Sequence, residues 1–229
     1  MKVIIAALEI EVSFLLKKLR RIQRFQAGVL KKYYGEIRGI RVLIVITGMG
    51  KFYARNGIQH ILQTETPTSL LSIGYAGGLA PDLKVGDIRF IRKVYGPGKP
   101  IHFAIENIFT FPEISLYTAE NVVRFPEEKL KLHQESAVHM VEMETYYLAE
   151  ELGLQNIPLT CLRVVLDTQQ DHLQDYGFFS PEGEIFFRKL LKFILTKPQS
   201  IRQLAILQRK GSLASRKIAD AALHWLENS

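Results

Sequence analysis

Carboxylates gather where the sequence predicts that buried strands end. A positioned carboxylate can give or take a proton in a reaction. Each acid also has a plainer structural role, because glutamates in a first helical turn offset the helix dipole and an aspartate after a strand caps the next helix. Strand ends are where open α/β sheets bind ligands, so their common position predicts a site made of Glu9, Glu11, Glu142, Glu144 and Asp167.

Glycines mark the same strand ends. Gly48-Met49-Gly50 follows one predicted strand, and the run 74–78, Gly-Tyr-Ala-Gly-Gly, follows another. A single Gly-Met-Gly is usually a turn. Together with the acids, these loops are predicted to line the site through Gly48, Gly50, Tyr75, Gly77 and Gly78.

Strands alternate with helices along the chain, which indicates an α/β fold. Apolar runs at period 2 predict strands, and apolar residues at i, i+4, i+7 predict helices. Beyond residue 166 the pattern is helical, with breaks expected at Pro198 and Gly211. The predicted strands are 2–7, 33–38, 40–47, 70–74, 85–94, 115–123, 137–143 and 159–166, and the earlier predicted helices are 9–22, 51–64, 126–134 and 144–152.

Composition fits one globular domain. The 229 residues, 47% of them hydrophobic, can bury one sizeable core. We expect a single domain over 1–229, with a basic helical extension over about 181–229. Cys161 is the only cysteine, so no intramolecular disulfide forms. With neither a signal-peptide pattern nor a membrane-spanning run, a soluble cytoplasmic protein is expected.

The net charge of +7 is concentrated in one segment. Residues 188–217 contain nine basic and no acidic residues, interleaved with apolar ones. A solvated helix face explains such a pattern, and so does an anionic partner. Of the possible partners we favour the surface of an anionic membrane over nucleic acid.

Taken together, the motifs resemble the nucleoside phosphorylase superfamily, and especially its methylthioadenosine/S-adenosylhomocysteine nucleosidase branch. They occur in the same order over residues 1–171. The resemblance implies a mixed central β-sheet flanked by helices, a homo-oligomer, and no metal or cofactor. The matching segments are 5–12, 47–51, 74–81 with 84–87, 141–144 and 162–167.

The resemblance also implies roles for individual residues. Glu144 would hold the ribose hydroxyls, with Met143 packed on the sugar, and Asp167 would protonate N7 of the departing purine. Glu11 would activate the attacking water. The residues that would hold these catalytic groups in place are Arg163, Glu142 and Glu9, although Glu142 is equally well explained as a satisfied structural carboxylate. Asn121 and Val122 would form the base-binding edge.

Four positions depart from the pattern. Tyr75 and Leu166 stand where nucleosidases carry serines, and Asn121 stands where an aromatic residue would stack on adenine. Ser72 stands where many phosphorylases carry a phosphate-binding arginine. Water is therefore the expected nucleophile, with phosphate as the alternative co-substrate. Arg55, or an arginine of a neighbouring subunit, could supply the missing charge.

Segment 116–123, the motif Pro126-Glu-Glu-Lys129, Lys197-Pro198 and the basic tail are similar to the hopanoid-associated phosphorylase-like group. That group is linked to removing adenine from adenosyl-hopanoid lipids. Three functions follow as alternatives. The first is cleavage of a 5′-substituted adenosine, including a lipid-linked one. The second is a housekeeping methylthioadenosine/S-adenosylhomocysteine nucleosidase, and the third a non-catalytic nucleoside-binding protein.

Overall fold

The computed structural model describes residues 1–102, 114–173 and 200–228, with side chains for all of these except 200–208. The described strands form one mixed sheet in the order β10-β6-β8-β9-β5-β1-β4-β3-β2, with β7 paired to β6. The strands are β1 (Lys2–Ala6), β2 (Arg20–Ala27), β3 (Leu30–Ile37), β4 (Ile40–Ile46), β5 (Ser69–Gly78), β6 (Ile88–Tyr95), β7 (Ile101–His102), β8 (Ile114–Thr118), β9 (Met140–Glu142) and β10 (Leu159–Asp167).

Five strands close into a ring. β5 pairs in parallel with β10 and antiparallel with β9, while β6 and β8 connect β10 to β9. This closure places Gly77 beside Asp167 on one side and beside Val141 on the other. The predicted mixed sheet is confirmed, and the ring brings acids from distant parts of the sequence to one end of it.

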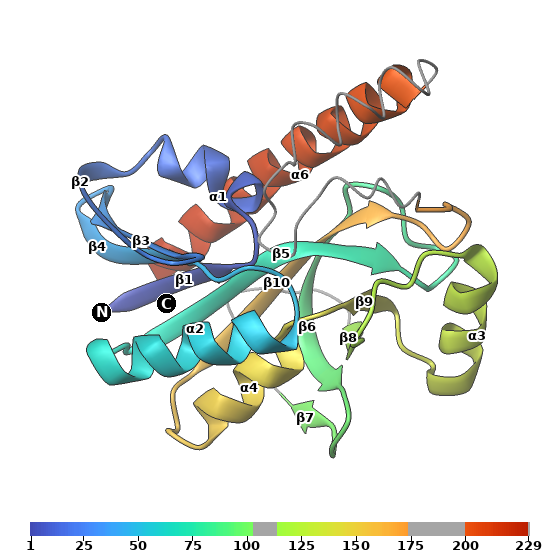
Figure 1. Ribbon diagram of the computed structural model, residues 1–229, viewed down its shortest axis with the longest axis horizontal. Helices are drawn as coiled ribbons and strands as arrows, with labels where there is room; N and C mark the ends of the chain where they lie inside the picture. The colour runs from blue at the N-terminus through green and yellow to red at the C-terminus, as the bar shows by residue number, and fades with distance from the viewer. Residues whose placement is uncertain (103–113, 174–199, 229) are drawn as a thin grey trace.

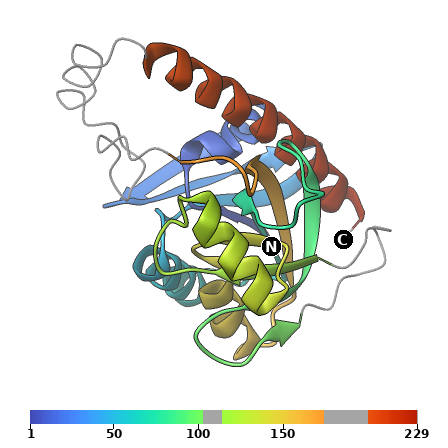
Figure 2. The same cartoon turned by 90° about the vertical axis from the view of Figure 1, so that its right-hand side faces the viewer.

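Helices cover both faces of the sheet (Figures 1 and 2). Because β1 is apolar at successive positions, Val3 and Ile5 pack into the core on one face and Ile4 and Ala6 into the core on the other. The first core includes α2 and α4, and the second includes α1 and α6. The helices are α1 (Glu9–Leu16), α2 (Lys51–Thr64), α3 (Pro126–Ser136), α4 (Thr145–Gly153) and α6 (Ser200–Asn228).

The predicted helix over 9–22 is too long. α1 ends at Leu16, and Arg20–Ala27 forms the edge strand β2, all of whose residues are exposed. Gly28, at φ 61°, makes the turn from β2 into β3. The apolar spacing that suggested a longer helix therefore belongs to a hairpin, because pairing with β3 replaces the helical hydrogen bonds.

The strand end predicted at Gly74 and the helix break predicted at Gly211 are also wrong. β5 continues through the glycines to Gly78, paired on both sides by β10 and β9. α6 continues through Gly211, whose missing side chain lets Ile10 and the Tyr75 hydroxyl approach to 3.7 Å from where a Cβ would lie. Pro198 and the part of the predicted extension over 181–199 lie outside the described residues.

Gly57→Ala tests the close packing of α2 on β4. Alanine is about 1 kcal/mol better than glycine inside a helix, but a Cβ on Gly57 would lie 2.3 Å from Thr47 Cγ2. Overpacking of this kind costs about 1–3 kcal/mol. We therefore expect a lower free energy of unfolding in urea. Gly153→Ala, which meets nothing within 4 Å, is the control and should be neutral or stabilising. A stabilised Gly57→Ala would contradict the packing described.

Candidate active site

A cavity of about 200 Å³ opens at the ring end where the predicted acids meet. It is bounded by the loop after β1, the ends of β5, β9 and β10, and the segment after β8. Of the predicted site residues, those that line it are Glu11, Tyr75, Gly77, Asn121, Val122, Glu142, Met143, Glu144 and Asp167.

Glu11 lies at one end of the cavity, in the first turn of α1. Its Oε2 accepts a hydrogen bond from Leu8 N at 2.8 Å, and its Oε1 accepts one from Tyr75 N at 2.9 Å. Burial raises the pKa of the Glu11 carboxyl, and these backbone N–H groups oppose the shift. Gly74 leaves space for this carboxylate, because a Cβ on it would lie 3.0 Å from Glu11 Oε1 and the carboxylate would have to shift. A buried carboxylate with a raised pKa is a stronger base than an exposed one.

Glu144 caps the start of α4 and reaches the Gly48-Met49-Gly50 loop. Gly50 N donates to Glu144 Oε1 at 2.6 Å. The loop needs its glycines, because Gly48 and Gly50 have φ values of 98° and 86°. Burial, and after it the charge of Glu142, raise the pKa of Glu144 to about 8. The two acids of 142–144 therefore differ in environment.

Glu142 is the satisfied member of that pair. It accepts hydrogen bonds from Thr118 Oγ1 at 2.6 Å and Thr145 Oγ1 at 2.8 Å, and it pairs with Arg163 at 3.1 Å. The guanidinium of Arg163 also donates to Ser72 Oγ at 3.0 Å. Both charged groups are buried. Glu142 thus supports the site through Arg163 and α4 as well as lining the cavity.

Asp167 lies at the opposite end from Glu11, where β10 ends. Its carboxylate packs against the backbone of Gly77, where a Cβ would lie 3.3 Å from Asp167 Oδ2. Lys129 of α3 donates to the same oxygen at 2.5 Å. Burial raises the pKa of the Asp167 carboxyl, and Lys129 acts against that shift.

Glu9 is not part of this cluster. It is exposed and pairs with Lys31 of β3 at 2.9 Å, which places it on the outer side of α1. Gly78 also lies outside the cavity lining, and a Cβ on it would lie 3.3 Å from Val165 Cγ1. Both residues were expected at the site from their positions in the motifs alone.

Known proteins share parts of this sequence pattern and its fold. Residues 2–103 match the family model described as the phosphorylase superfamily. The fold matches a Streptococcus pneumoniae MTA/SAH nucleosidase in complex with 8-aminoadenine, with 18% identity over 100% of this chain and 99% of that one and a TM-score of 0.74. The chain has the same fold as this nucleosidase.

Two further solved structures have a similar fold. An S-adenosylhomocysteine nucleosidase from Streptococcus pyogenes, in complex with 5-methylthiotubericidin, has a TM-score of 0.72 and 19% identity over 100% of this chain and 97% of that chain. A futalosine hydrolase mutant of Helicobacter pylori has a TM-score of 0.64 and 17% identity over 72% of this chain and 88% of that chain.

Tyr75, one of the departures from the superfamily pattern, turns its hydroxyl away from Glu11. The hydroxyl donates to Gly211 O at 2.9 Å and lies 2.6 Å from Ser215 Oγ, both on α6. Ser215 Oγ in turn donates to Ile10 O. The tyrosine therefore ties the site to the C-terminal helix, while its backbone N–H serves Glu11.

The other departures have separate consequences. The Ser72 hydroxyl accepts a hydrogen bond from Arg163. Arg55 forms an ion pair with Glu150 of α4. None of the described residues that line the cavity is an arginine or a lysine. Leu166 and Asn121 both line the cavity, where the leucine offers an apolar contact and the exposed amide of Asn121 can hydrogen-bond.

Several supporting residues were not predicted as site residues. Leu8, Met49 and Leu173 line the cavity, and Thr118 and Thr145 hold Glu142. Leucine, methionine and threonine are common residues without a distinct chemical signature, so even those within the matching segments, Leu8 and Met49, are not marked as site residues. Lys129 belongs to a quoted motif, but only the fold shows that its ammonium meets Asp167.

Glu144→Gln should change how stability depends on pH. With a pKa of about 8 against 4.5 in an unfolded chain, Glu144 binds a proton in the folded state that the unfolded state has already lost. Its ionisation therefore lowers the free energy of unfolding as pH rises from about 4.5 to 8. We expect Glu144→Gln to weaken that decline in urea titrations at pH 5 and pH 8. The exposed Glu127→Gln is the control, and a Glu144→Gln slope equal to that of the wild type would contradict the raised pKa.

Proposed function

We propose that the protein cleaves the N-glycosidic bond of a purine nucleoside and releases the base. The observation that carries this proposal is the placement of Glu11, Glu144 and Asp167 around one cavity. The superfamily fold and its nucleosidase relatives support the proposal. A protein that only binds nucleosides needs no acid for a leaving group, which makes the non-catalytic alternative the weaker one.

Each acid has a distinct role in the proposed reaction. As the bond breaks, positive charge develops on the sugar, and this charge favours the ionised form of Glu144 beside the ribose, which in turn stabilises it. Met143 packs on the sugar. Asp167 gives a proton to N7, so the base leaves as a neutral molecule. General acid catalysis of this kind accelerates a reaction by about 10²–10⁴-fold.

Water is the proposed nucleophile. Glu11, held by two backbone N–H groups, would take the proton from the water. The absence of arginine and lysine among the described cavity-lining residues supports hydrolysis over phosphorolysis, because a phosphate needs positive charge to bind. The sugar product is then the free sugar rather than a 1-phosphate.

A 5′-substituted adenosine is the proposed substrate. Tyr75 stands where nucleosidases carry a serine, and because its hydroxyl bonds to α6, we do not count its side chain against an ordinary methylthioadenosine/S-adenosylhomocysteine nucleosidase. Asn121 still lacks the aromatic face expected for stacking. The housekeeping nucleosidase and an enzyme for a lipid-linked adenosine remain the two alternatives within this class.

Asp167→Asn tests the proposed reaction. The enzyme and the variant are incubated with a panel of adenosine derivatives, with and without phosphate, and free adenine is measured. Wild type should release adenine without phosphate. The variant should lose about 10²-fold or more in kcat, because the acid for the leaving group is gone, while its urea unfolding stays cooperative. Near-normal release by Asp167→Asn would exclude the role of Asp167, and strict phosphate dependence would exclude water.

Association with an anionic membrane is proposed separately. Within the described residues, no helix has the length and apolar character needed to span a bilayer. Much of the basic segment 188–217 lies outside the described residues. In the part that is described, Lys217 donates to Gly86 O and Arg216 lies over the Phe14 ring, while Arg209 and Arg216 are exposed.

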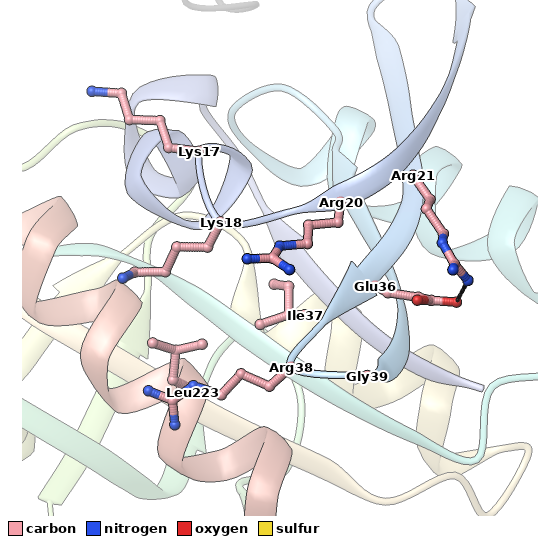
Figure 3. A pocket seen from close by; sticks show the side chains of 9 residues that line it. All are labelled: Lys17, Lys18, Arg20, Arg21, Glu36, Ile37, Arg38, Gly39 and Leu223. Carbon is pink, nitrogen blue, oxygen red and sulfur yellow. Dashed lines mark hydrogen bonds and ion pairs between the residues drawn. The ribbon is translucent and has the colours of Figure 1, made fainter.

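A second basic surface supports the membrane proposal instead. A hollow of about 630 Å³ lies between the end of α1, the β3–β4 turn and α6. Figure 3 shows Lys18, Arg20 and Arg38 around Ile37 and Leu223, with Arg21 turned to Glu36. Arg38 pairs with Glu227, whereas Lys18 and Arg20 have no ion pair among the described residues. This mixed basic and apolar surface suits lipid phosphates.

Liposome sedimentation with Lys18→Glu/Arg20→Glu tests this surface. Each Lys or Arg near an anionic bilayer contributes about 1 kcal/mol, so the double variant should bind anionic vesicles about tenfold more weakly or worse at low salt. Lys131→Glu, exposed on α3, is the control. If wild type does not bind, the membrane proposal fails, and the lipid-linked substrate fails with it. The homo-oligomer implied by the resemblance stays a prediction.

A further inference from the structure

A buried lysine attaches α3 to the candidate site. Lys129 is the one buried residue of α3, and it is 0% exposed. Its ammonium donates to Asp167 Oδ2 at 2.5 Å, Thr168 O at 2.9 Å and Asp171 O at 2.7 Å. An ammonium has three N–H donors, so all are used, and none remains for a substrate.

A lysine is a costly way to dock a helix. Removing an ammonium from water costs several kcal/mol unless its partners replace the lost hydration, and an apolar residue would anchor α3 without that cost. The ammonium of Lys129 instead donates to two backbone carbonyls and to Asp167, the proposed leaving-group acid. The position therefore points to a role for the charge itself.

The other charges near Asp167 do not replace that role. Asp171 raises the pKa of Asp167, and Lys210 of α6 lowers it, but both contribute less than Lys129. Asp171 is already engaged, because its Oδ2 accepts from Thr168 N at 2.8 Å and lies 4.0 Å from Lys210. Glu11 and Glu144 lie across the cavity and are held by backbone N–H groups.

We propose that Lys129 is a positioning residue that tunes Asp167 as the leaving-group acid, an inference that rests on the proposed function. It fixes Oδ2, which leaves Oδ1 for N7 of the purine. Its charge also keeps Asp167 from becoming too weak an acid in its buried place.

The proton balance of the step follows from this arrangement. The C1′–N9 bond breaks and its electron pair goes to the purine, while the proton on Asp167 moves to N7. Asp167 is left as a carboxylate, which the Lys129 ammonium stabilises. Water adds to C1′ and gives a proton to Glu11. A cation beside the acid thus favours the charged state that exists only after proton transfer.

Lys129→Met separates this role from simple docking. An opposite charge within hydrogen-bonding distance lowers an aspartate pKa by about 1–3 units, so its removal should raise the pKa of Asp167 by about one unit or more. The carboxyl band of Asp167, isolated by infrared difference against Asp167→Asn, titrates this group without turnover. Lys129→Arg should restore the wild-type pKa, and Lys131→Met on the same helix should leave it unchanged.

Turnover gives the second measurement. In Lys129→Met the alkaline limb of the kcat/KM profile should move to higher pH by about the same one unit, and the plateau should fall at least tenfold. If Lys129 had a purely structural role, its loss would lower the plateau but would leave both the Asp167 pKa measured by infrared and the alkaline limb of the profile unchanged. Lys129→Gln, polar but uncharged, serves if the methionine variant does not fold.

The outcomes are distinct. An Asp167 pKa that is unchanged in Lys129→Met or Lys129→Gln overturns the proposal, as does a shifted pKa in Lys129→Arg. If wild type cleaves no nucleoside, the proposed function fails, but the infrared titration still decides whether Lys129 sets the proton affinity of Asp167.

Discussion

The guanidinium of Arg163 lies in the protein interior, with 2% of the residue exposed. A charge there is tolerated only when its partners replace water, and Glu142, Ser72 and Thr145 do so from β9, β5 and α4. Thr118 of β8 completes the shell around Glu142. Strands and a helix that meet at the ring end are therefore joined by one ion pair. Losing one partner of such a pair typically costs about 3–5 kcal/mol, so the geometry of the cavity depends on this contact.

Around that ion pair, three carboxylates are buried by three different means. Backbone N–H groups of Leu8 and Tyr75 hold Glu11, and Gly50 N holds Glu144. Asp167 alone receives a full positive charge, from Lys129. Burial raises the pKa of all three carboxyls, while the backbone N–H groups and the lysine both act against that shift. Similar side chains within one cavity are thus held by different kinds of donor.

The sequence predicts the α/β class and most element positions, because buried strands such as 159–166 and helices such as 51–64 have clear periodicity. It also places Glu11, Glu144 and Asp167 at strand ends, which the ring then gathers. Periodicity fails for β2, whose exposed residues give no burial pattern, and for glycines inside β5 and α6. In β5 and α6 tertiary contacts decide the backbone, since β5 is paired by β10 and β9 through its glycines and α6 packs into the core with α1.

What sequence alone does not predict is contact between residues far apart in the chain. The hydroxyl of Tyr75 contacts α6 over a separation of 136 residues, and Lys129 meets Asp167 over 38. The residues next to Tyr75 and Lys129 in the sequence do not indicate these contacts. The glycine-loop motif placed Tyr75 at the site. Its backbone N–H does donate to Glu11 there, but its hydroxyl donates to α6. Glu9, in contrast, matched a motif and yet forms a surface ion pair.

The contact between Ser215 and the carbonyl of Ile10 has a consequence for synthesis of the protein. Residues on both sides of Glu11 are held by a helix that leaves the ribosome more than 200 residues after them. Since chains emerge from the N-terminal end, β1 and α1 must wait with one apolar side uncovered until α6 arrives to pack against Val12 and Leu15. Nascent chains that stop short of α6 would expose that side to chaperones and proteases, so only chains that include α6 would carry a finished nucleophile pocket.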